Sequence, residues 1–298
     1  MKFIAAATAA GHLPMVYGDK HQTKPIMKKI PSSGEMIPIV GMGTSRTFDQ
    51  MDNKQMHPQL LEVLVEFFAK GGTVIDSSPM YGSAETMLGA LLAMLDNKPD
   101  YFAASKIWTD GKDAGAKAVD ESCQRMNVET MDLMAVHNLR DWQIHIETLK
   151  ELKAKGKVRY IGITTSRARQ YDEFEKVMSS QPLDFVQLNY NLGEREAEQR
   201  LLPLAQENGI AVMVNRPFQR ASLFGQVKGR ELPGYAKDLG ITSWGQFFLK
   251  FIVSHPAVTC VIPATSKAKH MRDNMQAQFG ELPDANLRQK MLTDFQAV

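Results

Sequence analysis

The sequence has little of what marks a disulfide-stabilised, membrane-spanning or nucleic-acid-binding protein. Its 298 residues include 2 cysteines, Cys123 and Cys260, which lie far apart and form neither a disulfide framework nor a zinc-ligand pattern, so we expect two buried thiols. No run of about 18 apolar residues is present, which argues against a transmembrane helix. The formal net charge is +2, so neither nucleic acid nor an acidic membrane is expected as a partner.

From Ile37 onward, short apolar runs alternate with segments of helical spacing. Eight runs are predicted to be strands: IPIVGMG, GTVIDSS, YFAASK, MDLMAVH, YIGITT, FVQLNY, AVMVNRP and TCVIPAT. Several lack polar alternation, as strands buried on both faces do. Between the strands, apolar residues recur at helical spacing, for example Leu60, Leu64, Phe67 and Phe68 before Gly71 and Gly72, and again from Trp142 to Leu152.

Eight strand–helix units over about 250 residues predict an α/β fold, a single-domain (β/α)8 barrel. A doubly wound sheet also alternates strands and helices, but its Gly-rich turn is poorly matched by GMGTSR, which lacks a third glycine. The stretch MKKIPSSGEMIPIV predicts a small hairpin at the bottom of the barrel. We therefore expect a barrel over residues 28–298 and, over the alanine-rich and then polar residues 1–27, either a disordered leader or the remnant of an export signal.

Four titratable residues fall at the ends of successive predicted strands. Asp76 ends the second strand and Tyr81 follows it, whereas Lys106 and His137 end the third and fourth. Each alone has an ordinary structural explanation, such as a cap, a half-buried ring, a solvated amine or a satisfied histidine. Because the carboxyl ends of barrel strands meet on one rim, their convergence instead indicates an active site.

Proton donation by the tyrosine accounts for all four residues. A phenol has a pKa of about 10, and the ammonium of Lys106 would lower it, while Asp76 would pair with that ammonium. His137 would orient the carbonyl oxygen that receives the proton. An acid without a base, nucleophile or metal beside it suggests reduction of a carbonyl, with the hydride supplied by a cofactor.

The stretch from Asp76 to Gly82, together with Ser105-Lys106 and His137, resembles the catalytic tetrad of the aldo-keto reductases in order and approximate spacing. The resemblance extends from about Lys28 to Asn274 and includes GMGT, SKIW, IGITT, VQLNY and IPATSKAKHMRDN. It implies an NAD(P)H-dependent enzyme that reduces aldehydes or ketones on a (β/α)8 barrel. In that case Tyr81 is the general acid, Lys106 and Asp76 tune it, and His137 orients the carbonyl.

The resemblance also implies cofactor and substrate contacts. The implied cofactor-binding residues are Gly43, Thr44, Asp76, Thr164, Thr165, Gln187, Arg216, Thr265, Ser266, Lys267, His270 and Asn274. Arg216 stands where an aromatic residue commonly stacks on the nicotinamide. Lys267, Lys269 and Arg272 favour NADPH over NADH, because a helix N-terminus and cations suit the 2′-phosphate. Ser45, Met80 and Trp108 are expected to line an open pocket for small carbonyl compounds, and a monomer is favoured.

Other functional classes remain open at this point. One is a regulatory subunit that binds the cofactor with negligible turnover. Another is a barrel hydrolase or isomerase, although no metal-ligand spacing is present, since His145 is expected on an outer helix face. The expected location is the cytoplasm; if the N-terminus is a truncated signal, the alternative is the periplasm, reached by a route that exports folded protein.

Overall fold

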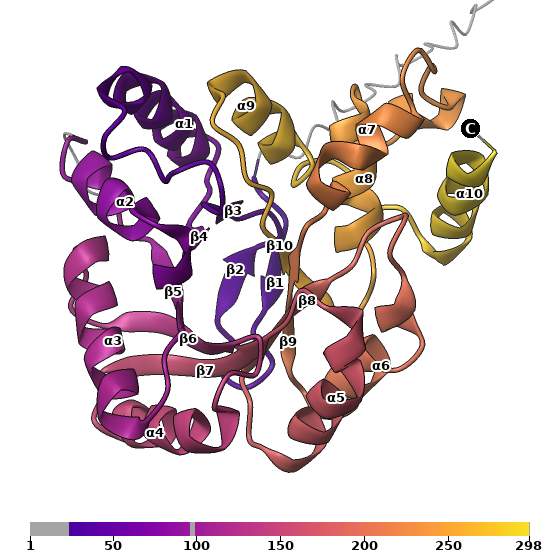
Figure 1. Ribbon diagram of the computed structural model, residues 1–298. Helices are drawn as coiled ribbons and strands as arrows, with labels where there is room; N and C mark the ends of the chain where they lie inside the picture. Colours follow the sequence, from indigo (N-terminus) through magenta and orange to yellow (C-terminus); the bar gives the residue numbers. More distant parts are fainter. Residues whose placement is uncertain (1–23, 96–98, 298) are drawn as a thin grey trace, which may run out of the picture.

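Eight parallel strands form a ring surrounded by helices in the computed structural model, which describes residues 24–95 and 99–297 (Figure 1). The strands follow one another around the ring in chain order: β3 (Met42–Gly43), β4 (Val74–Asp76), β5 (Phe102–Ile107), β6 (Met131–His137), β7 (Val158–Thr164), β8 (Phe185–Asn189), β9 (Ala211–Asn215) and β10 (Val258–Val261). The predicted (β/α)8 barrel is confirmed. Most of the predicted leader lies outside the described residues.

The barrel closes between its first and last strands. Isolated parallel bridges join Val40 to Val261 and Gly43 to Ala264, and the backbone N–H of Gly41 donates to the Val261 carbonyl at 2.8 Å. A Cβ on Gly41 would lie 2.8 Å from the carbonyl oxygen of Val74, so only glycine allows this close approach of strands.

A two-stranded antiparallel hairpin, β1 (Met27–Lys29) and β2 (Met36–Pro38), lies against one end of the barrel. Ile30 and Ile37 of this hairpin join a buried cluster with side chains from the barrel interior, among them Phe102 and Phe185. The Lys28 ammonium donates to the carbonyls of Val253, His255 and Val258 at 2.7, 3.1 and 2.6 Å. The predicted hairpin therefore plugs the barrel and is tied to the segment that leads into β10.

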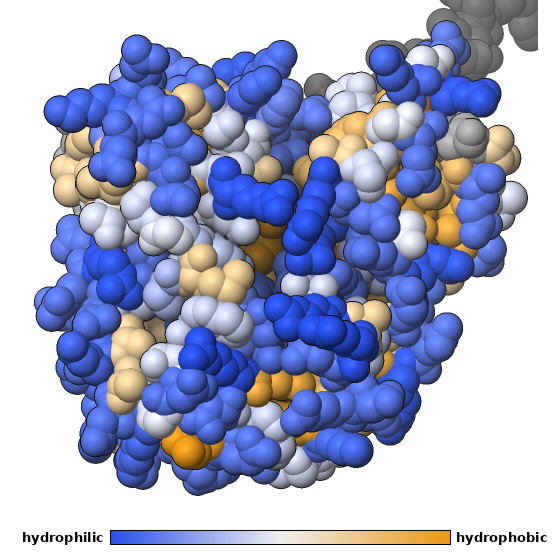
Figure 2. All heavy atoms as spheres, viewed as in Figure 1, coloured by the Kyte–Doolittle hydropathy of each residue, from blue (hydrophilic) through white to orange (hydrophobic). Residues whose placement is uncertain are grey.

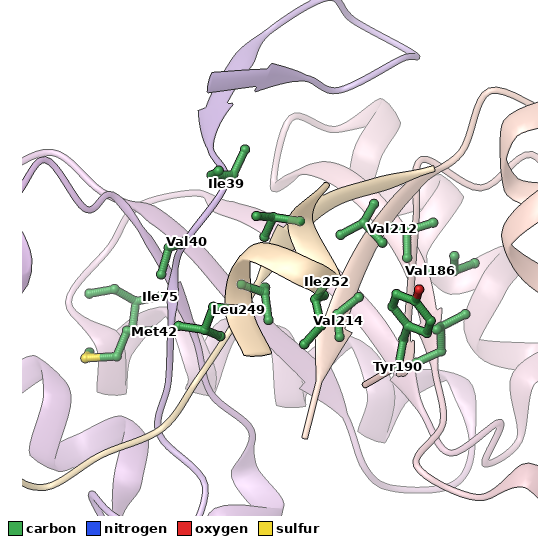
Figure 3. Packing of buried hydrophobic residues seen from close by; sticks show 14 of the residues in the cluster. Ile39, Val40, Met42, Ile75, Val186, Tyr190, Val212, Val214, Leu249 and Ile252 are labelled. Atoms are coloured by element: carbon green, nitrogen blue, oxygen red, sulfur yellow. The ribbon is translucent and has the colours of Figure 1, made fainter. Parts of the chain in front are cut away.

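Helices cover the outside of the barrel. They are α1 (His57–Ala69), α2 (Ala84–Leu92), α3 (Lys112–Met126), α4 (Trp142–Ala154), α5 (Tyr171–Ser180), α6 (Leu201–Glu207), α7 (Ser222–Gln226), α8 (Trp244–Val253), α9 (Ala268–Gln276) and α10 (Ala285–Gln296). Leu249 and Ile252 of α8 pack in the same buried cluster as Val212 and Val214 of β9 (Figure 3). Among the described residues, no helix is long and apolar enough to cross a membrane.

Two expectations about individual residues have different outcomes. Cys123 and Cys260 are free and buried, as predicted. The expectation for His145 is wrong: its side chain is fully buried, with Nε2 2.8 Å from the Thr109 carbonyl oxygen. Gly115 of α3 permits this, because a Cβ there would lie 2.6 Å from the imidazole. His145 therefore packs between helices instead of facing solvent.

Candidate active site

A cavity of about 1200 Å³ opens at the carboxyl ends of the strands. Figure 2 shows a hollow in the middle of the face seen in Figure 1, ringed by hydrophilic side chains. Asp76, Tyr81 and His137 line the cavity, and Lys106 lies beneath them with 1% of its surface exposed. The structure thus brings together the four residues that strand-end positions singled out.

Lys106 and Asp76 form a buried ion pair below the cavity. The ammonium donates to both oxygens of Asp76, at 2.6 and 2.7 Å, and to the carbonyl of Ser77 at 2.6 Å. All three ammonium protons are therefore used. Burial works against the charge on Lys106, but the Asp76 carboxylate together with Tyr81 and Glu85 outweighs it, so the pKa of the ammonium is raised and Lys106 stays charged.

The ion pair continues into a chain of hydrogen bonds toward β7 and β8. The Gln187 amide donates to Asp76 at 2.9 Å, and the Thr164 hydroxyl donates to the Gln187 side-chain oxygen at 2.8 Å. Thr164 lines the cavity, whereas Gln187 lies behind it. Since its proton is already donated, the Thr164 hydroxyl presents only acceptor lone pairs to a ligand.

Tyr81 is held at the cavity by a short turn that follows β4. Residues Pro79–Tyr81 form a single 3-10 turn, and Gly82 ends it with a φ of 62°. A Cβ on Gly82 would lie 2.3 Å from the Asp49 carboxylate, which accepts the Ser83 N–H at 2.8 Å. Glycine is needed here both for its backbone conformation and for space.

The pKa of Tyr81 differs from the expectation. Lys106 lies 5.3 Å from the centre of the Tyr81 ring and does favour the phenolate, as predicted. Burial has the larger effect, however, and the Asp76 carboxylate adds to it, so the pKa of the phenol is raised above its usual value. Tyr81 is therefore fully protonated at neutral pH, as a proton donor must be.

His137 is a neutral imidazole with a hydroxyl partner. Burial, followed by the charges of Lys106 and Arg167, lowers its pKa to about 3. Its Nδ1 lies 3.0 Å from the Ser78 hydroxyl oxygen, which also accepts the Met80 N–H at 3.2 Å. If Nδ1 accepts the Ser78 proton, the imidazole proton lies on Nε2.

Aromatic rings fix the position of the imidazole. The ring centres of Tyr81 and Trp108 lie 5.8 and 5.1 Å from that of His137, both edge to face. Trp108 is not among the residues that line the cavity; it packs on His137 and under the Arg140 guanidinium. The structure places it as a support for the imidazole, whereas Ser45 and Met80 line the cavity directly.

The implied cofactor residues divide into two groups. Those that line the cavity are Gly43, Asp76, Thr164, Arg216, Thr265, His270 and Asn274. Thr44, Thr165, Gln187, Ser266 and Lys267 are not among the lining residues. Thr44 donates to the Asp76 carbonyl, and Lys267 N–H donates to the Thr265 hydroxyl, so several of this second group support residues of the first.

An unpaired amide oxygen tests whether a nicotinamide would fit. The side-chain Oδ1 of Asn215, a cavity-lining residue at the end of β9, is buried without a partner among the described residues. A buried acceptor without a donor costs about 1–3 kcal/mol. A carboxamide supplies two N–H donors, which is what such an oxygen lacks. The residues at this end of the cavity therefore fit the group.

The other end of the cavity is basic but less so than the sequence suggests. Thr265, which follows β10, and His270 on α9 line the cavity, and Lys267 and Lys269 are exposed beside them. Burial and the two lysines lower the pKa of His270. Arg272, in contrast, forms a two-point ion pair with Glu66 of α1. One of the three predicted cations is thus already engaged within the protein.

Several residues of the site escape sequence reasoning. Ser78 lies between Asp76 and Tyr81 in the sequence, but nothing in that stretch shows that its hydroxyl meets His137. Arg46, Arg167 and Arg220 line the cavity and directly follow strand ends or lie in the adjoining loops. The sequence did contain one indication of their role: they follow predicted strands, and the loops after barrel strands form the rim of the active site.

Comparison with known proteins gives one consistent assignment. The model of the aldo/keto reductase family matches residues 39–289. Methylglyoxal reductase YeaE of Escherichia coli is 28% identical over 269 residues, which cover 87% of this chain and 92% of that protein. The NADH-specific methylglyoxal reductase of E. coli is 26% identical over 246 residues, covering 71% of this chain and 73% of that protein.

Solved structures show the same fold. An aldo-keto reductase from Klebsiella pneumoniae in complex with NADPH superposes with a TM-score of 0.75 at 24% identity, covering 91% of this chain and 95% of that one. The glycerol dehydrogenase AKR11B4 from Gluconobacter oxydans gives 0.74 at 21% identity, covering 91% and 95%. These similarities concern the fold, whereas the family match spans most of the sequence. The chain belongs to the aldo/keto reductase family and is an NAD(P)H-dependent oxidoreductase.

Proposed function

We propose that this enzyme reduces aldehydes or ketones to alcohols with NADPH and that Tyr81 is the general acid. The main support for the proposal is that a protonated phenol, a buried Lys106–Asp76 ion pair and a neutral His137 lie together at one cavity. Together these groups can donate a proton to the alkoxide that develops when a carbonyl is reduced.

The residues act on the carbonyl oxygen in two ways. When bound, the reduced nicotinamide supplies the hydride to the carbonyl carbon. The Nε2–H of His137 hydrogen-bonds the carbonyl oxygen and fixes its position. As negative charge develops on that oxygen, the Tyr81 phenol gives it a proton, which leaves a phenolate beside the Lys106 ammonium. Asp76 keeps that ammonium charged and in place, so the phenolate is stabilised and later recovers its proton from water.

For the cofactor, we propose that Thr164, Gln187 and Asn215 hold the carboxamide. The adenosine phosphate would lie at Thr265, Ser266, Lys267, His270 and Asn274, with Gly43 and Thr44 closing the site from β3 and Thr165 and Arg216 from the loops after β7 and β9. The exposed Lys267 and Lys269 favour the 2′-phosphate, and hence NADPH over NADH.

A binding titration followed by an assay tests the proposal. We expect NADPH to quench tryptophan fluorescence with a Kd at least about tenfold lower than that of NADH, as loss of one charge-assisted contact would give. Small aldehydes, including methylglyoxal, should then oxidise the bound NADPH. Tight binding without turnover of any carbonyl would instead identify a regulatory subunit, and absence of dinucleotide binding would contradict the proposal altogether.

Ser78 provides a more selective test of the role of His137. Ser78→Ala removes the hydrogen bond to Nδ1, so we expect a fall in kcat of about tenfold, since one hydrogen bond of about 1 kcal/mol no longer fixes the tautomer. The Kd for NADPH should not change. In wild type, the ¹⁵N shifts of His137 should report a neutral ring with the proton on Nε2 down to pH 5; in the variant, both tautomers should be populated. Ser78→Thr should restore the wild-type shifts, and an unaltered spectrum in Ser78→Ala would contradict the role.

A further inference from the structure

Four guanidinium groups line the mouth of the cavity. They belong to Arg46, Arg167, Arg216 and Arg220. The acidic residues that share the lining at the mouth are already engaged: Asp49 accepts the Ser83 hydroxyl and N–H at 2.8 Å, and Asp273 accepts from Ser243 and Gln246 at 2.7 and 2.6 Å. These neutral donors leave both carboxylate charges in place, but Asp76 is paired with Lys106, so the four guanidiniums still give the lining a net positive charge.

Within the described residues, none of these four arginines has a counter-ion; Arg216 donates to the carbonyl and hydroxyl oxygens of Ser166 instead. Arginines elsewhere on the surface commonly have one. Examples are Arg125 with Glu85, Arg159 with Asp132 and Arg272 with Glu66. The hydrophilic side chains around the hollow in Figure 2 agree with this concentration of polar groups.

Arg46 and Arg220 are close enough to act on Arg216, and Arg167 is close enough to act on the site. Burial, then the neighbouring Arg220 and more weakly Arg46, lower the pKa of Arg216. Arg167 contributes in the same way to the low pKa of His137. Mutual repulsion of unpaired cations is unfavourable, and an anion bound among them relieves it.

The positions of the four arginines indicate which of them contact the cofactor and which are available to a substrate. Arg216 is among the proposed cofactor-binding residues, and Arg220 lies beside it in the loop after β9, so the cofactor accounts for both. Arg46 follows β3 and Arg167 follows β7, strands that lie on opposite sides of the eight-stranded ring. This pair faces the cavity from both sides, and Arg167 acts on the carbonyl-orienting histidine.

We infer that the carbonyl substrate carries an oxyanion, a carboxylate or a phosphate, which Arg46 and Arg167 bind at the mouth while its carbonyl meets Tyr81 and His137. The inference rests on the proposed reduction and narrows its substrate class. Guanidinium is suited to this task because its planar donors match both kinds of oxyanion.

Matched aldehydes test the inference. 4-Carboxybenzaldehyde and 4-formylphenyl phosphate carry the anion, and 4-carbamoylbenzaldehyde is a neutral analogue of similar size. We expect kcat/KM to be at least about tenfold higher for one or both anions, the discrimination expected of a charged hydrogen bond. The better of the two identifies the type of oxyanion. The preference should shrink at high ionic strength, because exposed charges are screened.

Arginine variants assign the preference to residues. Arg46→Gln and Arg167→Gln should each raise KM for the anionic aldehydes about tenfold and leave the neutral aldehyde unchanged. Arg169→Gln is the matched control, since Arg169 is exposed two residues from Arg167 and does not line the cavity. A weakened Kd for NADPH in place of the change in KM would assign both arginines to the cofactor and overturn the inference. So would equal losses on neutral and anionic aldehydes, or no preference in wild type.

A ligand without an aldehyde separates failure of the inference from failure of the proposed reaction. Terephthalate binding to the protein mixed with NADPH can be measured by calorimetry whether or not any carbonyl is reduced. If no aldehyde is turned over, the proposed function fails. Terephthalate binding that weakens about tenfold in Arg46→Gln and Arg167→Gln, but not in Arg169→Gln, would still support the anion site. Absence of such binding would overturn it.

Discussion

Replacing Tyr81 with phenylalanine is expected to lower kcat for aldehyde reduction by about 10²–10⁴-fold, the usual contribution of a positioned general acid. The ring remains, so its edge-to-face contact with His137 and its place beside Lys106 remain as well. Only the hydroxyl is lost, and no other residue of the tetrad can replace its proton: Lys106 is committed to three acceptors and His137 is neutral. The rate is measured from the absorbance of reduced nicotinamide.

Two controls make this result specific. The Kd of Tyr81→Phe for NADPH should equal that of wild type, because the phenol is not among the proposed cofactor contacts. Tyr101→Phe removes a different hydroxyl, which donates to the Met126 carbonyl at 2.9 Å outside the cavity, and should leave kcat unchanged. If Tyr81→Phe retained more than about a tenth of wild-type kcat with saturating NADPH, Tyr81 would not be the acid.

Replacing Lys106 with methionine should cost about 3–5 kcal/mol in free energy of unfolding, because it leaves the Asp76 carboxylate buried without its partner. Asp76 is 4% exposed and would keep only the Gln187 amide as a side-chain donor. Turnover should fall as well, since the phenolate left by proton transfer would have no cation beside it. Urea unfolding measures the first effect and a steady-state assay the second.

A double substitution separates charge from packing. Combining Lys106→Met with Asp76→Asn removes both charges and should recover much of the lost stability but none of the activity. Lys250→Met is a control for burial alone: this lysine is 1% exposed and donates to the Phe279 and Glu281 carbonyls at 2.7 Å, without a carboxylate. It should destabilise the protein with little effect on kcat. A Lys106→Met protein as stable as wild type would show that the ion pair does not hold the site.

The sequence was informative where periodicity and chain order determine the outcome. Strand ends of a barrel must share one rim, so Asp76, Lys106 and His137 could be brought together without a structure. The choice of partners across distant elements cannot be obtained in this way. Whether Arg272 meets Glu66 or a ligand, and whether His145 faces solvent or α3, depends on how helices pack, and the sequence-based expectation for His145 was wrong.

The balance between competing electrostatic effects on a pKa could not be predicted from the sequence either. The sequence predicted that Lys106 would lower the pKa of Tyr81, and the ammonium does act in that direction. The net shift is upward because burial and Asp76 outweigh it, and the depth of burial is a property of the whole barrel. The hydrogen bond between the Ser78 hydroxyl and His137 likewise cannot be predicted from the sequence, because it forms only when the ends of β4 and β6 lie side by side.

The closure of the barrel between β3 and β10 has a consequence for folding during synthesis. The ribosome makes Val40 and Gly43 more than two hundred residues before their bridge partners, Val261 and Ala264. Until then the nascent sheet has two open edges, and the Lys28 ammonium has none of its three carbonyl acceptors, which begin at Val253. Pairing over such sequence separation is slow, and open edges invite association with other chains. A message truncated before the codons for TCVIPAT should therefore yield an aggregating chain and not a smaller barrel.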